Sequence, residues 1–232
     1  MAKFSVVGKP IPQVNAREKV LGTALYVGDL TLPHLLHAKV LRSPYPHARI
    51  RQIDAERARR VPGVKAVVTG ADTPILYGPL HKDQHVLAVE KVRFSGEEVA
   101  AVAAVDENTA LDALELVRVE YEELPAVFDP EEALRPGAPE IHAGTGNLAR
   151  ELRIERGDVD AGFREAAHIH EATYQTSYQY HAFTEPMGSV ASVDASGRLT
   201  VWAPTQSVHY TRHLLSAALG LPISQVRVLQ TY

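Results

Sequence analysis

The chain has 232 residues, a formal net charge of −4 at pH 7 and no cysteine, which excludes disulfides, thiolate zinc sites and iron–sulfur clusters held by this chain alone. A hydrophobic fraction of 45% and a charged fraction of 22% are typical of a globular protein with one large or two ordinary domains. The charge gives no reason to expect a nucleic-acid partner, and without a signal peptide or membrane span we expect a cytoplasmic protein with no membrane contact.

The chain begins with a segment that predicts an extended arm. Val7–Val20 contains two prolines and no helical period, and we assign residues 1–16 to the arm. Leu35–Arg42 then has the apolar spacing of a strand buried on most of its surface. Asp54–Val61 predicts a helix with Asp54 as its N-cap.

A small apolar run marks the centre of the first domain. Val99–Val105 contains only valine and alanine, which predicts a central strand covered on both faces by helices. Asp106 or Asn108 can cap the helix that follows, and extended structure is expected over 86–94. Alternating strands and helices indicate an α/β domain over residues 17–128.

The segment Asp129–Asn147 predicts a linker, because three prolines and three glycines interrupt any period there. The second domain is assigned to residues 148–232. Within it, Asp158–Ala167 predicts a capped helix, and Ile169–Tyr180 alternates like a long strand that would pair with Ser189–Val193.

Two strands joined by a hairpin precede the candidate site. They are Val190–Asp194 and Leu199–Ala203, with the turn at Ser196 and Gly197. Pro204 cannot donate to a sheet, so the second strand must end there.

The chain then passes from this strand into a helix, expected over His209–Leu219, with a hydroxyl of Thr205 or Ser207 as its cap. Gln206 therefore lies at a strand-to-helix corner. Such corners hold polar side chains toward ligands and expose backbone N–H groups that suit anionic cofactors, although most glutamines in capping turns are simply solvated.

The eleven histidines do not form a metal-binding pattern. The pairs considered are His34 with His37, His168 with His170, and His181 with Glu185. The last pair resembles half of a zinc motif, but Pro186 prevents the required helix, so we expect no metal ligand set in this chain. Glu98 and Glu185 are candidate bases that nothing in the sequence singles out further. From the residues alone, the chain is a two-domain α/β protein of undetermined activity.

Seven motifs, in consistent order and spacing, cover nearly the whole chain. They are Gly22–Asp29, Leu41–Ile50, Val61–Val64, Val92–Ala104, Val119–Ala126, His181–Met187 and Trp202–Gln206. Together they resemble the molybdenum hydroxylases, the family of xanthine dehydrogenases and aldehyde oxidases. The resemblance implies the fold class α/β (α+β), with an α/β-hammerhead domain followed by the start of a molybdenum cofactor-binding domain.

The resemblance also implies a cofactor and a reaction. Gln206 matches the family glutamine that approaches the molybdenum centre, and it is the only cofactor-binding residue we assign; we assign no catalytic residue in this chain. The implied cofactor is molybdenum–molybdopterin, in its cytosine dinucleotide form. The implied enzyme is an oxidoreductase that hydroxylates an electron-poor carbon of a small-molecule heterocycle or aldehyde, with electrons passing to [2Fe-2S] clusters and FAD on partner subunits.

The sequence departs from the family pattern at Tyr232. The family continues with a Gly-Gly-Gly-Phe-Gly loop, arginines and a catalytic glutamate, so we expect a shortened chain or one piece of a split subunit that is inactive without the remainder of the molybdenum subunit. Tyr77–Leu80 and Val92–Ala100 also resemble the large subunit of 4-hydroxybenzoyl-CoA reductase, which implies reductive dehydroxylation as an alternative. A non-catalytic assembly module of such a complex is the second alternative.

Overall fold

The computed structural model describes residues 4–232, which form three three-stranded sheets with helices between the strands. The chain divides into two compact units, Met1–Pro125 together with Met187–Tyr232, and Ala126–Pro186. Within residues 4–232, every helix is too short or too polar to cross a bilayer.

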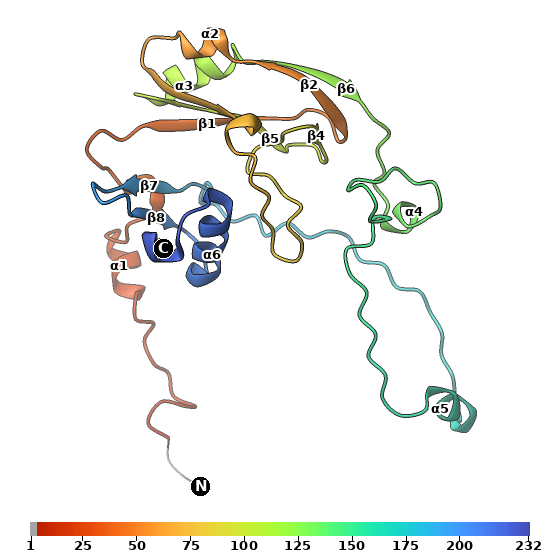
Figure 1. Cartoon of the computed structure of the whole chain (residues 1–232). Helices are drawn as coiled ribbons and strands as arrows, with labels where there is room; N and C mark the ends of the chain where they lie inside the picture. The colour runs from red at the N-terminus through yellow and green to blue at the C-terminus, as the bar shows by residue number, and fades with distance from the viewer. Residues whose placement is uncertain (1–3) are drawn as a thin grey trace. The chain divides into compact units, whose positions relative to one another are not determined.

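The first sheet has the order β1 (His37–Arg42), β5 (Glu98–Ala104), β3 (Val64–Thr69), with both pairings antiparallel. The central position of the apolar run is thus confirmed. Figure 1 shows α2 (Glu56–Arg59) and α3 (Glu107–Leu114) together on one face of this sheet.

Among residues 4–232, the helices packed on this sheet are α2 and α3, and both lie on the same face, so the prediction of helices on both faces is wrong. Val102 packs against Ala58 of α2 and Ala113 of α3 in one core cluster. Val99 points the other way and belongs to a second cluster with Val92. The physical reason is that antiparallel strands need no crossover helix, so nothing in the connectivity forces a helix onto the opposite face.

Of the N-caps predicted for these two helices, that of α3 is correct and that of α2 is wrong. Asp106 caps α3, since its Oδ1 accepts from the Thr109 N–H at 2.8 Å. The helix expected from Asp54 is shorter, with Ala55 in the cap position. Asp54 stays in a strand because it pairs with Arg118, although its Oδ1 still accepts from the Glu56 N–H at 3.0 Å.

The second sheet has the order β4 (Lys91–Val92), β2 (Ala48–Asp54), β6 (Arg118–Glu123), and is also antiparallel. The extended structure expected over 86–94 shrinks to the two residues of β4.

The N-terminal arm is only partly extended. Ala16–Leu21 forms α1, which corrects the prediction of an extended segment there. Gly22 ends this helix with a left-handed φ of 68°, a conformation that glycine adopts without strain. Two 3₁₀ turns follow along the unit, η1 (Val27–Asp29) and η2 (Gly70–Asp72).

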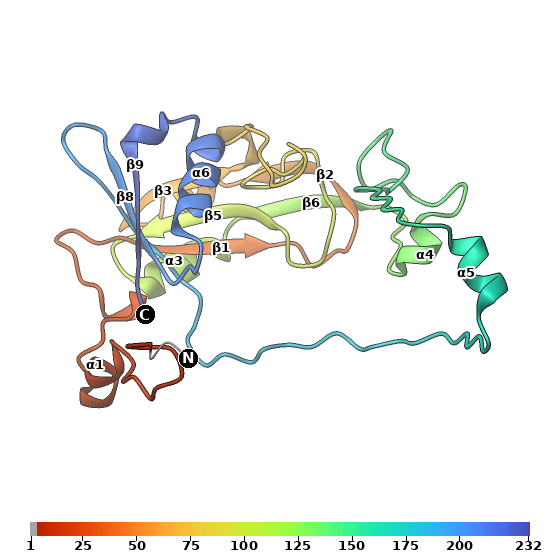
Figure 2. The ribbon, with the colours of Figure 1, turned by 90° about the horizontal axis from the view of Figure 1, so that it is seen from below.

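The third sheet positions the candidate site. Its order is β7 (Val190–Val193), β8 (Leu199–Ala203), β9 (Val226–Gln230); β7 runs antiparallel to β8, and β9 runs parallel to it. The expected hairpin is confirmed. The parallel pair requires a crossover, and α6 (Val208–Leu219) with η3 (Ile223–Gln225) supplies it, as Figure 2 shows.

The helix α6 is fixed at its end and along its buried face. Gly220 has a φ of 64°, and the Leu221 N–H donates to the Ser216 carbonyl at 3.1 Å, which together form a Schellman motif. Leu215 packs on a buried cluster that contains Val201 and Val226.

The second unit, Ala126–Pro186, contains two short helices, α4 (Pro130–Ala133) and α5 (Val159–Glu165). Asp158 caps α5, as its sequence predicts. Asn147 braces the preceding loop by donating to the Ala133 and Pro139 carbonyls at 2.9 and 3.0 Å. The division into a linker at 129–147 and a domain at 148–232 stays a prediction.

The long strand expected at Ile169–Tyr180 is absent from the described structure, so that prediction is wrong. Tyr174 and Tyr178 have exposed fractions of 82% and 102%. Sequence alternation reports which side chains share a face, but a strand also needs a hydrogen-bonding neighbour, and β7 pairs with β8 instead.

Candidate functional site

The corner that carries Gln206 is built from the end of β8 and the beginning of α6. β8 ends at Ala203 because Pro204 has no N–H to offer the sheet, and α6 begins at Val208. Gln206 lies between them and is exposed. Within residues 4–232, its side chain makes no hydrogen bond, so the amide is available to a ligand.

Thr205 shapes this corner, although not by capping the helix. Its hydroxyl oxygen accepts from the Ser207 N–H at 3.2 Å and hydrogen-bonds the Thr211 hydroxyl at 3.0 Å. Ser207 occupies the N-cap position without a side-chain cap bond, so the expected hydroxyl cap is wrong. The first-turn N–H groups of α6 therefore have no capping side chain, which leaves them suited to an anion.

The carboxyl ends of β8 and β9 meet at this corner. The register places Ala203 opposite Gln230, and the Thr231 N–H donates to the Ala203 carbonyl at 3.2 Å. Gln230 is exposed, as Gln206 is. Ligands of open α/β sheets bind at the carboxyl ends of parallel strands, so this edge is the candidate binding site.

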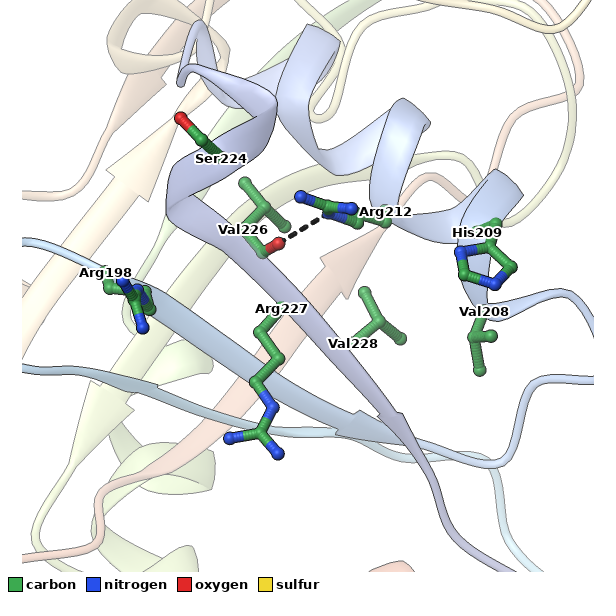
Figure 3. Close-up of a pocket in the computed structure, with 8 residues that line it drawn as sticks. All are labelled: Arg198, Val208, His209, Arg212, Ser224, Val226, Arg227 and Val228. Atoms are coloured by element: carbon green, nitrogen blue, oxygen red, sulfur yellow. Dashed lines mark hydrogen bonds between the residues drawn. The ribbon is translucent and has the colours of Figure 1, made fainter.

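Arg212 holds α6 against β9. Its Nε donates to the Val226 carbonyl at 2.7 Å, and its guanidinium also donates to the Ile223 carbonyl at 2.6 Å. Figure 3 shows the guanidinium directed from the helix at Val226. Because α6 begins directly after the corner, this clamp also limits the movement of Gln206.

A groove of about 400 Å³ runs along this clamp between α6 and β9. It is lined by Arg198, Val208, His209, Arg212, Ser224, Val226, Arg227 and Val228. The groove has a valine floor and basic side chains around it. Its basic lining adds positive potential beside the first turn of α6.

The residues at the corner fit an anionic organic cofactor that carries its own metal. They offer a neutral amide at Gln206 and unsatisfied N–H groups at the beginning of α6, which are groups that orient anions and oxygen atoms. Among residues 4–232, no three His, Cys, Asp or Glu side chains converge as metal ligands. Protein ligands to the metal are not required when the cofactor's own atoms hold it.

The other candidates from the sequence lie in other elements of the chain. Glu98 is in β5, where it accepts from Arg42 at 2.6 Å. His170 is exposed and contacts the Tyr174 hydroxyl at 3.4 Å. Glu185 lies in the second unit and has a buried Oε1 without a hydrogen-bond partner.

Two polar side chains that the sequence analysis did not single out line one pocket, Asn15 before α1 and Thr231 after β9. Asn15 Oδ1 and Thr231 Oγ1 are buried without a hydrogen-bond partner. Neither residue stands in a recognisable motif, and the two are far apart in sequence. The fold brings them to the lining of the same pocket.

Two family models match the chain. One is described as "Aldehyde oxidase and xanthine dehydrogenase, a/b hammerhead domain" and covers residues 21–125. The other is described as "Molybdopterin cofactor-binding domain" and covers residues 141–232. The second match includes the Gln206 corner and all of the β7–β8–β9 sheet.

Individual relatives agree with these models. The chain is 40% identical over 229 residues to the nicotinate dehydrogenase large molybdopterin subunit of Eubacterium barkeri, covering 98% of this chain and 54% of that protein. It is 35% identical over 234 residues to the xanthine dehydrogenase molybdenum-binding subunit of Escherichia coli O157:H7, covering 95% of this chain and 31% of that protein. The chain thus spans about half or less of the length of these curated relatives.

A solved structure extends the agreement to three dimensions. The aldehyde oxidoreductase from Desulfovibrio gigas superposes with a TM-score of 0.85 at 29% sequence identity, covering 95% of this chain and 26% of that one. The fold and the corner define an α/β protein with exposed polar groups at the ends of parallel strands, within the segment that matches the cofactor-binding domain model. The chain belongs to the molybdenum hydroxylase family, the xanthine dehydrogenases and aldehyde oxidases, and carries its hammerhead domain and part of its molybdopterin-binding domain.

Proposed function

We propose that this chain forms part of the molybdenum-binding subunit of an oxidoreductase, and that Gln206 contacts its molybdopterin cofactor. The observation that carries this proposal is the exposed, unbonded amide of Gln206 where β8 ends, within the segment that matches the cofactor-binding domain model. When bound, the cofactor would supply two-electron oxidation of the substrate. The chain's own contribution is to orient it through the Gln206 amide and the first-turn N–H groups of α6.

The substrate class in this proposal is a small electron-poor heterocycle or aldehyde, which the enzyme hydroxylates. The names of two relatives, a nicotinate dehydrogenase and a xanthine dehydrogenase subunit, support a nitrogen heterocycle. Electrons would leave through [2Fe-2S] and FAD partners, and the cofactor would take the cytosine dinucleotide form. We also propose that the complex is cytoplasmic. The predicted linker at 129–147 would join the hammerhead domain to the cofactor-binding domain.

The test of this function uses the whole molybdenum-binding subunit produced with its partner subunits. Gln206→Ala should lower kcat by about 10- to 100-fold, as expected for the loss of one hydrogen bond to a charged reacting group. Gln225→Ala is the matched control, because Gln225 is an exposed glutamine in η3, at the opposite end of β9. Equal activity in both variants would contradict the assignment of Gln206 to the cofactor site.

The substrate is identified in the same preparation by product analysis. The preparation is incubated with nicotinate or with an aromatic aldehyde, each in the presence of an artificial electron acceptor. One of these two substrates should give a hydroxylated product. A second incubation replaces the acceptor with a low-potential electron donor and adds a hydroxylated aromatic CoA thioester; loss of the ring hydroxyl as water, with two electrons taken from the donor, would instead favour the reductive alternative. A complex that assembles but turns over none of these substrates would favour the assembly module.

A further inference from the structure

The residues on either side of Gln206 are held by hydrogen bonds, whereas the Gln206 side chain makes none within the described part of the chain. The Thr205 N–H donates to the Ala203 carbonyl at 2.9 Å, and the Ser207 N–H donates to Thr205 Oγ1 at 3.2 Å. The Ser207 carbonyl in turn accepts from the Thr211 N–H at 2.9 Å, which begins α6. The backbone is therefore fixed before and after Gln206.

A pair of threonine hydroxyls closes this corner. Thr205 Oγ1 and Thr211 Oγ1 lie 3.0 Å apart and share a hydrogen bond, in which either hydroxyl can donate. Both side chains are half-buried, so the bond is less exposed to competition from water than one on an open surface. The pair links the segment that precedes Gln206 to the helix that follows it.

One oxygen atom takes part in both interactions. Thr205 Oγ1 accepts from the Ser207 N–H and also bonds the Thr211 hydroxyl. A threonine side chain has three staggered positions about χ1, and the Thr211 hydroxyl favours the one that keeps this oxygen in the turn. Loss of the Thr211 hydroxyl should therefore weaken the turn around Gln206 as well.

The turn matters because Gln206 lies on neither a helix nor a strand. A group that orients a ligand must be held within about 0.5 Å of its productive position, and loops hold side chains less precisely than regular elements do. The shared bond of Thr205 and Thr211 supplies this support at the corner. It also lowers the entropy that is lost when the amide engages a bound molecule.

We propose that Thr205 and Thr211 are positioning residues for the oxidoreductase reaction, because their shared hydrogen bond holds the Gln206 amide in the orientation that meets the cofactor. This inference rests on the proposed function. Neither threonine contacts the cofactor in this arrangement, and both act through Gln206. The set of residues that form the site thereby extends from one side chain to three.

A double-mutant cycle in the whole molybdenum-binding subunit with its partners tests this inference. Thr205→Val keeps the shape of the side chain and removes its hydroxyl, so kcat should fall about 3- to 10-fold, as expected for one neutral hydrogen bond. In the Gln206→Ala background the same substitution should lower kcat by less than about twofold, because the residue that it positions is gone. Thr211→Val should behave in the same way. Equal fold losses in the two backgrounds would overturn the inference.

The conservative variant and a matched control separate the hydroxyl from the position. Thr205→Ser keeps an oxygen for both interactions and should retain kcat within about twofold of the wild type. Thr200→Val is the control, since Thr200 lies within β8 and its hydroxyl makes no hydrogen bond within residues 4–232. It should leave kcat unchanged, and a loss equal to that of Thr205→Val would contradict a specific role of the hydroxyl pair.

A second readout needs no bound cofactor. Amide hydrogen exchange at Ser207, followed by mass spectrometry after short labelling of the cofactor-free subunit, should be severalfold faster in Thr205→Val and unchanged in Thr205→Ser. Equal exchange in Thr205→Val and the wild type would overturn the inference. If Gln206→Ala alone left kcat unchanged, the proposed function itself would fail, and this failure is distinct because neither threonine is altered.

Discussion

At the scale of single residues, Arg212 links the helix that follows the corner to β9. Its guanidinium donates to two backbone carbonyls, those of Ile223 and Val226, and the residue is half-buried. Hydrogen bonds from charged donors contribute about 1.5–3 kcal/mol each to stability, and a buried carbonyl that loses its donor adds a desolvation cost.

Arg212→Met keeps the aliphatic part of the side chain and removes both interactions. The free energy of unfolding should fall by about 2–4 kcal/mol, measured by urea denaturation. Arg227→Met is the control, since Arg227 is exposed and makes no side-chain hydrogen bond within the described chain, and it should change stability by less than about 0.5 kcal/mol. Equal effects of the two substitutions would show that Arg212 is no clamp.

The position of Gln206 could be predicted from the sequence, because Pro204 ends the strand and a helical period begins soon after it. The unpaired atoms of Asn15 and Thr231 could not, because burial and missing partners are properties of the packed chain. The hydroxyl cap was also misassigned. Thr205 bonds Thr211 and the Ser207 N–H instead, and hydroxyl geometry at a turn is not encoded by spacing alone.

At the scale of elements, the hairpin between β7 and β8 shows a carboxylate that organises a turn. Asp194 Oδ1 accepts from the Ser196 hydroxyl at 2.6 Å, the Ser196 N–H at 2.9 Å and the Arg198 N–H at 3.0 Å. These bonds, led by the Ser196 hydroxyl, lower the pKa of Asp194 below its ordinary value of 3.8. Gly197 completes the turn with a φ of 81°.

A lowered pKa makes the contribution of Asp194 depend on pH. The charged form is favoured in the folded state, so the stabilisation is complete above the unfolded-state pKa and is lost as the pH falls through the lower folded-state pKa. Asp194→Asn should therefore unfold at a lower denaturant concentration than the wild type at pH 7, and the difference should shrink below pH 3.8. A difference that is constant from pH 7 to pH 3 would contradict this explanation.

Element boundaries were harder to predict than element types. The strand β5 was recognisable from its uniformly apolar composition, and the helix α6 from its period and the glycine that follows it. The helices α1 and α2 were misjudged because each is only six or four residues long, below the length at which a period is readable. Ile169–Tyr180 alternates without pairing, because register and partner are set by the rest of a sheet.

At the scale of the whole molecule, the second unit differs from the first in how it is stabilised. Ala126–Pro186 contains two short helices, neither of which has a buried residue. By contrast, β5 includes four residues, Val99, Ala100, Val102 and Ala104, with no exposed surface.

This difference predicts where a protease acts first. Trypsin should cut initially within 126–186, at sites such as Arg150, Arg153 or Arg156, because exposed backbone without ladder hydrogen bonds fits a protease cleft. Mass spectrometry of the earliest fragments locates the cut. A first cut at Arg118, inside β6, would contradict the assignment of the two units.

The central claim is that this chain contributes to a molybdopterin site shared with the rest of the subunit. A neutral hydrogen bond from Gln206 contributes about 0.5–1.5 kcal/mol net, well short of the roughly 8 kcal/mol of micromolar binding. The relatives are two to three times as long as the matched region, so most cofactor contacts are expected from residues outside it. The isolated 232-residue chain should therefore bind little or no molybdenum.

Elemental analysis of the whole molybdenum-binding subunit, purified with its partners beside the 232-residue chain alone, tests this claim most directly. We expect close to one molybdenum per whole subunit, accompanied by pterin, and almost none on the 232-residue chain. A whole subunit that is folded and assembled but contains neither molybdenum nor pterin would contradict the account.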